Sequence, residues 1–195
     1  MAQGNGSPGW LVAVVRVPSE PSRHRVAVWR ELRRAGAVQL SPGTWALPEI
    51  DANVEVVERV RSIAAGAGGE ATVLRVAGAG YDDEARLRAA YTAARAQDWD
   101  ELCADCEKLL VEIAGEIAKG KLTLAELEEE EQSLERLRRW HRGVRLRDVV
   151  GPSDGRDRAD ALLERCAQAI TDFEQRVFEA TTAEHRPDAA GPVSG

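Results

Sequence analysis

The chain has 195 residues, 44% of them hydrophobic and 30% charged, which is typical of a globular protein that buries a core. It has no apolar run near the roughly 18 residues of a membrane span, and its first nine residues lack the basic start and apolar middle of a signal peptide. We therefore expect a cytoplasmic protein that makes no contact with membranes. Its three cysteines are expected to be reduced thiols.

The net charge of −7 is distributed unevenly along the chain. Residues 10–78 carry nine arginines against seven carboxylates, whereas the rest of the chain carries 17 basic against 26 acidic residues. An anionic partner is therefore expected to prefer the first part of the chain.

The first elements are a strand and a helix. Residues 10–17 form a β-branched apolar run ended by Pro18, which predicts a central strand. Ser22 is a suitable N-cap for a helix of about three turns, and Gly36 ends that helix as a C′ glycine.

Two short strands, a helix and a fourth strand follow. The strands are expected at 37–40 and 44–48, joined by a Pro-Gly turn. Asp51 or Asn53 can cap a helix that runs to Gly66, and alternation predicts a last strand in 70–78. The order βαββαβ predicts an α+β fold with a ferredoxin-like domain at 10–78, both helices covering one face of an antiparallel sheet.

The remainder is expected to be helical. Apolar residues recur at helical spacing in three long segments, the second opened by a capping box of Thr123 and Glu126. Short loops between long helices favour an antiparallel bundle, which we place at 79–186. The tails at 1–9 and 187–195 are expected to be disordered.

The first predicted helix carries the most informative surface. Its apolar side contains Val28 and Leu32 with Trp29 at the edge, while arginines occupy the opposite side. Clustered guanidiniums bind phosphates and oxyanions, so we expect a DNA- or oxyanion-binding site there. The alternative is an ordinary solvated helix face. The candidate residues on this side are Arg23, Arg30, Arg33 and Arg34.

A second basic patch lies in the middle of the long helical part. Its candidate nucleic-acid-binding residues are Arg138, Arg139, Arg142 and Arg145. Glutamates precede them on the same helix, so charge pairing between neighbouring turns is the competing interpretation.

Other chemistry-bearing residues do not form a recognisable catalytic site. Cys103 and Cys106 have a C-x-x-C spacing, but no second pair and no preceding strand, so we expect packed thiols in the core, like Cys166. The histidines are too scattered for a ligand cluster and are expected at the surface. The glutamate run 128–131 is expected to be a solvated face, and we expect neither a metal nor a cofactor.

The segment RVPSEPSRHRVAVWRELRRAGAVQLSPGTWALP, residues 16–48, resembles the N-terminal domain of the chromate resistance protein ChrB. The resemblance continues through 106–140 and 165–180. It implies a bacterial transcriptional regulator of chromate resistance, distantly similar to phenylacetate-degradation repressors. The arginines that match the family's basic segment, and that the resemblance implies as the DNA- or oxyanion-binding site, are Arg23, Arg25, Arg30, Arg33 and Arg34. Full-length members carry a further C-terminal domain tied to the chromate response, so we expect sensing to be absent, altered or supplied by another chain.

Two functional hypotheses follow. The first is a non-enzymatic regulatory module that binds operator DNA, or chromate or another oxyanion, through its first helix. We expect it to be a homodimer, because a small ferredoxin-like unit exposes a sheet face and edges that need a cover. The second is an interaction or scaffold module whose acidic helical part docks a partner. Chromate reduction by Cys103 and Cys106 is a third, less favoured hypothesis.

Overall fold

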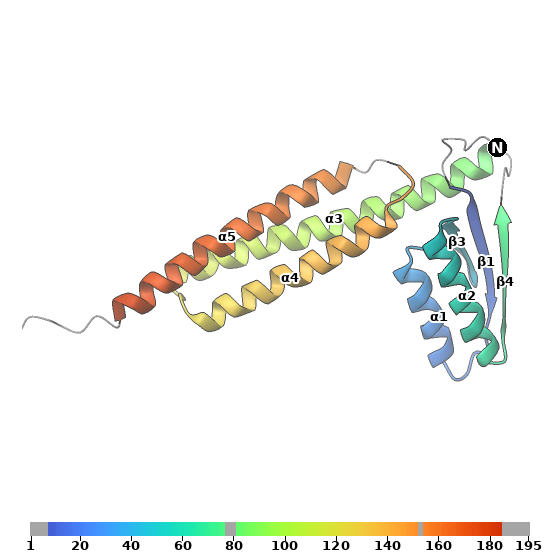
Figure 1. The fold of residues 1–195 in the computed structure, drawn as a ribbon, viewed down its shortest axis with the longest axis horizontal. Helices are drawn as coiled ribbons and strands as arrows, with labels where there is room; N and C mark the ends of the chain where they lie inside the picture. Colours follow the sequence, from blue (N-terminus) through green and yellow to red (C-terminus); the bar gives the residue numbers. More distant parts are fainter. Residues whose placement is uncertain (1–7, 77–80, 152–153, 185–195) are drawn as a thin grey trace, which may run out of the picture. The chain divides into compact units, whose positions relative to one another are not determined.

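The computed structural model describes residues 8–76, 81–151 and 154–184. The chain is an α+β protein whose elements follow one another in the order β1 (Trp10–Arg16), α1 (Arg23–Arg34), β2 (Val38–Ser41), β3 (Thr44–Pro48), α2 (Asp51–Gly66), β4 (Glu70–Val76), α3 (Tyr81–Lys119), α4 (Leu124–Arg147) and α5 (Asp154–Glu184) (Figure 1). The expected βαββαβ order and the three long helices after it are confirmed.

The chain divides into two compact units, and α3 and α4 each contribute to both. The first unit contains the sheet, its two helices, the start of α3 up to Gln97, and the segment 145–153. The second contains the rest of α3 and α4 together with α5. The domain limits expected from the sequence, 10–78 and 79–186, stay a prediction. Residues 1–7 and 187–195 of the expected disordered tails lie outside the described residues.

The sheet has the strand order β2-β3-β1-β4, and all three pairings are antiparallel. The long apolar strand β1 is central, as its sequence predicted. Gly43, with a φ of 77°, closes the hairpin between β2 and β3 in a left-handed conformation that suits glycine. β2 is a short edge strand, and its pairing with β3 shifts register between Gln39 and Ser41.

Both α1 and α2 pack on one face of this sheet (Figure 1). Because side chains alternate along a strand, Leu11, Ala13 and Val15 of β1 all point to this face. There they form one buried cluster with residues of both helices, including Leu32 and Val60, which are fully buried. This packing fixes which side of α1 faces solvent.

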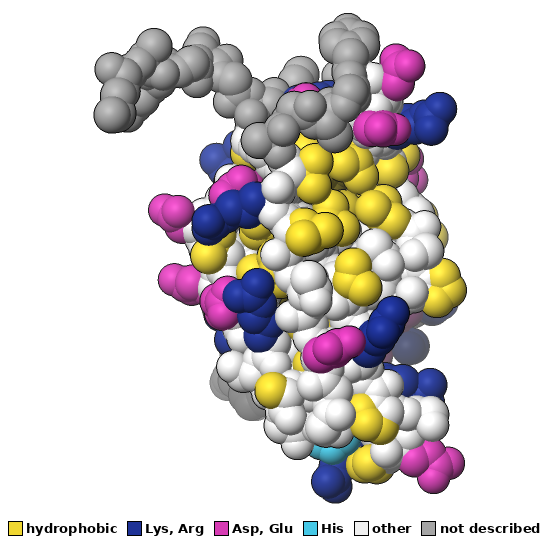
Figure 2. All heavy atoms as spheres, turned by 90° about the vertical axis from the view of Figure 1, so that its right-hand side faces the viewer, with side chains coloured by type: hydrophobic (Ala, Val, Ile, Leu, Met, Phe, Trp, Pro, Cys, Tyr) yellow, Lys and Arg dark blue, Asp and Glu magenta, His cyan; other side chains and the backbone are white. Residues whose placement is uncertain are grey.

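The opposite face of the sheet is only partly covered. Trp10 packs edge-to-face on Tyr91 of α3 at one end, with ring centroids 5.8 Å apart. Farther along, Leu40 and Leu74 stay 44% and 51% exposed. Hydrophobic side chains accordingly gather on this side of the molecule (Figure 2). We call this apolar region the outer sheet face.

The second unit has its own core. Trp99, Leu102, Leu137 and Phe173 are fully buried where α3, α4 and α5 pack together. α3 runs through Gly115 without interruption, because nothing crowds the helix at that point and one glycine only weakens it.

The predicted helix ends are partly correct. Gly36 has a φ of 78°, which confirms its position after α1, and Thr123 Oγ1 accepts the Glu126 N–H at 3.3 Å. Ser22 occupies the N-cap position but makes no side-chain cap bond. The predicted cap of α2 is wrong: Ile50 is the N-cap, while Asn53 lies inside the helix and donates to the Pro48 carbonyl at 2.9 Å. Within the described ranges, none of the helices has the length and apolarity needed to cross a bilayer.

Candidate anion-binding surface

All five candidate arginines of α1 are exposed. Val28 and Leu32 are buried against the sheet and hold the helix in a fixed rotation. The side of α1 that carries Arg23, Arg30, Arg33 and Arg34 is therefore turned outward, whereas Arg25 lies on the sheet side of the first turn. We call this set the arginine face: Arg23, Arg25, Arg30, Arg33 and Arg34.

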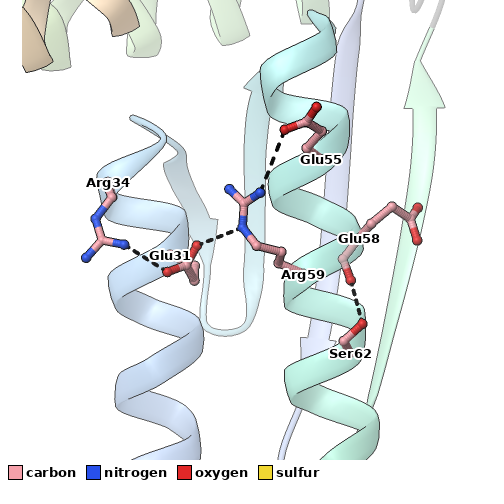
Figure 3. Close-up of polar contacts among 6 residues, drawn as sticks. All are labelled: Glu31, Arg34, Glu55, Glu58, Arg59 and Ser62. Atoms are coloured by element: carbon pink, nitrogen blue, oxygen red, sulfur yellow. Dashed lines mark hydrogen bonds and ion pairs between the residues drawn. The ribbon is translucent and has the colours of Figure 1, made fainter.

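One member of the arginine face is held by an ion-pair network (Figure 3). Arg34 Nη1 lies 3.0 Å from Glu31 Oε1 on the same helix. Arg59 of α2 donates from Nε to Glu31 Oε2 at 3.3 Å and also approaches Glu55 at 3.9 Å. Arg34 is therefore paired with one carboxylate, Glu31, which it shares with Arg59.

The other four arginines make no ion pair with any carboxylate in the described part of the chain. Arg33 has its guanidinium carbon 5.8 Å from the centroid of the Trp29 ring, a cation–π geometry that leaves its charge in place. Arg23 Nε donates to His24 Nε2 at 3.4 Å. The arginine face thus retains concentrated positive charge along about three helical turns.

Trp29 is a candidate functional residue that sequence reasoning did not assign to the site. It is 49% exposed beside Arg33, although the helical pattern placed it at the edge of the core side. The strand beneath this edge of α1 is β2, which offers Gln39 on the helix side because Gln39 pairs with the buried Trp45. A short edge strand with a polar residue there cannot cover the indole. An exposed aromatic residue among arginines could have been suspected as a stacking surface.

The second basic patch is less concentrated. All four of its arginines are exposed, but Arg142 Nη2 lies 3.1 Å from Glu135 Oε1, and Arg139 donates to the Glu135 carbonyl at 3.4 Å. Arg145 belongs to the first compact unit, whereas Arg138, Arg139 and Arg142 belong to the second. Charge pairing within α4, the competing interpretation from the sequence, is therefore present.

The three cysteines are free thiols buried in the core of the second unit, as expected. Cys166 Sγ donates to the Cys106 carbonyl at 3.4 Å. The hydrogen bond with Cys166, together with burial, raises the pKa of the Cys106 thiol, and burial raises the pKa of Cys103. Among the described residues, no group of three or more His, Cys, Asp or Glu side chains is arranged to hold a metal ion.

Two expectations about surface residues are wrong. Glu130, within the run expected to be solvated, is only 6% exposed, and burial with the nearby Glu112 and Glu129 raises its pKa to about 7. His141 has a side chain only 12% exposed and bonds Asp160 Oδ1 at 2.5 Å while packing on Trp99. Both residues lie where α4 meets a neighbouring helix. The spacing of apolar residues along one helix does not reveal which polar residues such a contact will bury. His185 lies outside the described residues.

The four-stranded antiparallel sheet with its two helices, followed by three long packed helices, defines the chain as an α+β protein, and α1 carries the exposed arginines. The chain belongs to the family described as Protein ChrB, N-terminal, whose model matches residues 25–184. The match begins inside α1 and ends at the last residue of α5, so it includes four of the five arginines. Membership relates the chain to chromate resistance. Among curated proteins, none matches.

Proposed function

We propose that this protein is a non-enzymatic regulatory module of chromate resistance that binds operator DNA through the arginine face. The observation that carries the proposal is that Arg23, Arg25, Arg30 and Arg33 have no carboxylate partner within the described residues. Guanidiniums that are not neutralised internally can replace the counterions of a phosphate backbone, which supplies most non-specific DNA affinity.

The position of α1 supports this role. The helix is anchored by two buried residues on a sheet, so its arginines are held on a rigid element with defined spacing. Trp29 adds an exposed aromatic ring next to Arg33, a combination common on nucleic-acid-binding surfaces. The proposal includes chromate or another oxyanion as a smaller ligand of the same guanidiniums, since bidentate pairing suits any tetrahedral oxyanion.

The proposal is tested by fluorescence anisotropy with duplex DNA taken from upstream of the protein's own gene, over a range of salt concentrations. The variant Arg23→Ala/Arg30→Ala/Arg33→Ala should bind at least tenfold more weakly, and its salt slope should fall by roughly two to three, since each phosphate contact contributes about 0.9.

The matched control removes the same charge from the second basic patch. Arg138→Ala/Arg139→Ala/Arg142→Ala lowers the net charge equally but leaves α1 intact. Equal losses in both variants would indicate that only net charge matters, and an unchanged salt slope in the first variant would remove the arginine face from the proposed function.

A second candidate function is partner docking through the acidic start of α4. Glu128, Glu129 and Glu131 are exposed within about one turn of the helix and have no ion pair among the described residues. A Glu128→Gln/Glu129→Gln/Glu131→Gln variant that loses a partner captured by the parent, while keeping its DNA affinity, would favour this scaffold role.

A further inference from the structure

A groove opens on the first unit beneath the N-terminal half of α1. Its volume is about 650 Å³, and it is bounded by the end of β1, the turn between β2 and β3, and α1 itself. The residues that decide its chemistry are Arg16, Arg25, Val26, Trp29, Gln39 and Trp45. Of these, only Arg25 also belongs to the arginine face.

The groove exists because the helix extends beyond what the sheet can cover. α1 presents Val26 and Trp29 toward β2, where they stay 40% and 49% exposed. β2 has four residues and offers Gln39 at this position, so the space between helix and edge strand is not filled. The deeper wall is formed by Trp45, which is 5% exposed. The result is an apolar cleft lined by two indole rings, those of Trp29 and Trp45.

Positive charge flanks this apolar space. Arg25 makes no ion pair among the described residues, and Arg16 makes only a long contact, 3.7 Å, with Glu70, while its side chain is 79% exposed. None of the residues bounding the groove is acidic. An apolar cleft with two cations and no anion selects ligands that combine a flat apolar body with negative charge.

The size of the groove also indicates its occupant. Small-molecule sites commonly have volumes of about 300–1,000 Å³, and this groove falls within that range. A protein partner would need about 800 Å² of buried surface on each side, more than a cleft between one helix and one edge strand provides. From these observations we infer that the groove is a binding site for a small organic anion with a flat apolar body.

This inference goes beyond DNA binding and does not depend on it. The ligand's charged end would be held by Arg16 and Arg25, and its apolar body would lie against Trp29 and Trp45. Because Arg25 is shared with the arginine face, a bound ligand would also withdraw one guanidinium from DNA.

The test compares two probes of the same shape, naphthalene-2-sulfonate and the neutral naphthalene-2-methanol, by NMR titration with the full chain. The sulfonate should bind about tenfold more tightly, as expected for a charge-assisted contact. Arg16→Ala/Arg25→Ala should reduce that preference toward one. Trp29→Ala should weaken both probes, and Gln39→Trp, which fills the groove from its opposite wall, should do the same even if Trp29→Ala folds poorly.

Two matched controls separate this site from other surfaces. Arg176→Ala removes an exposed guanidinium on α5, outside both the groove and the arginine face, and Leu74→Ser removes apolar surface from the outer sheet face. Neither variant should change the affinity of either probe. Equal affinity for the two probes, the absence of saturable binding, or a loss of binding in Leu74→Ser that is missing in Gln39→Trp would overturn the assignment. None of these outcomes affects the DNA measurement, which rests on Arg23, Arg30 and Arg33.

Discussion

Glu31 of α1 accepts a hydrogen bond from Arg59 of α2, with 3.3 Å between Oε2 and Nε. The same carboxylate also holds Arg34, so Glu31 is the residue that subtracts one charge from the arginine face. Its side chain is only 20% exposed and lies between the two guanidiniums.

Replacing this carboxylate should strengthen DNA binding. Glu31→Gln releases Arg34, so affinity should rise several-fold at low salt and the salt slope should steepen by up to about 0.9. The free energy of unfolding should fall by no more than about 1 kcal/mol, because ion pairs near the surface contribute little. Anisotropy titrations at several salt concentrations measure the first effect, and urea unfolding measures the second. Glu164→Gln, an exposed change on α5 with the same charge difference, should change neither. Weaker DNA binding by Glu31→Gln would contradict the proposed function.

The fold could be predicted from the sequence because its signals are local. The apolar run of β1, the Pro42–Gly43 turn and the Val28–Leu32 stripe each depend on neighbouring residues. The contact between Arg34 and Glu31 is equally local, since the two residues lie one helical turn apart. The partner Arg59, 28 residues away in the sequence, becomes visible only when α1 and α2 lie side by side.

The parts of the site that could not be predicted depend on strand register and helix packing. Trp29 is exposed because Gln39, and not an apolar residue, pairs with Trp45 at the sheet edge. Glu130 is one of four consecutive glutamates, but it is buried because a neighbouring helix packs on that turn of α4. Composition alone treats all four of these glutamates alike.

The outer sheet face should mediate the proposed homodimer. Leu40 and Leu74 leave an exposed apolar surface on a four-stranded sheet, and a second copy would cover it. Leu74→Asp should convert the dimer to a monomer in multi-angle light scattering at micromolar concentration. Val111→Asp, at a 72% exposed position of α3, is the matched control and should leave the mass unchanged. A monomeric parent protein would end the proposal of a dimer.

Glu130 should make stability depend on pH. Its pKa is raised to about 7 in the folded protein by burial and by neighbouring carboxylates, against 4.5 for an ordinary glutamate. Between these two values the unfolded chain has lost this proton while the folded chain keeps it. The contribution of Glu130 to stability is therefore fully present below about pH 4.5, falls as the pH rises, and is lost above about 7.

Glu130→Gln removes this dependence. The variant should be more stable than the parent at pH 8, by at most about 3 kcal/mol, and similar to it near pH 4.5. Guanidinium unfolding at the two pH values measures the difference. Glu128→Gln, an exposed change on the same helix, should show a difference that hardly varies with pH. A gain for Glu130→Gln of equal size at both pH values would mean that the carboxyl does not titrate in this range.

The cysteines should be unreactive in the folded protein. Burial raises the pKa of Cys103, the hydrogen bond with Cys166 and burial raise that of Cys106, and all three thiols are enclosed by the helical core. Ellman's reagent should therefore modify less than one thiol per native chain within minutes and all three in guanidinium. Rapid modification of both Cys103 and Cys106 in the native protein would instead support redox chemistry at that pair.

Two glycines inside long helices should respond to alanine with opposite signs. A Cβ at Gly115 of α3 meets nothing within 4 Å, so Gly115→Ala should stabilise the protein by about 0.5–1 kcal/mol through the lower backbone entropy of the unfolded chain. A Cβ at Gly155 in the first turn of α5 would lie 2.5 Å from Trp99 Cβ, so Gly155→Ala must displace a fully buried indole and should cost about 1–3 kcal/mol. Urea unfolding of the two single variants measures both effects with the same substitution in the same unit. A stabilising Gly155→Ala would show that the start of α5 does not pack on Trp99.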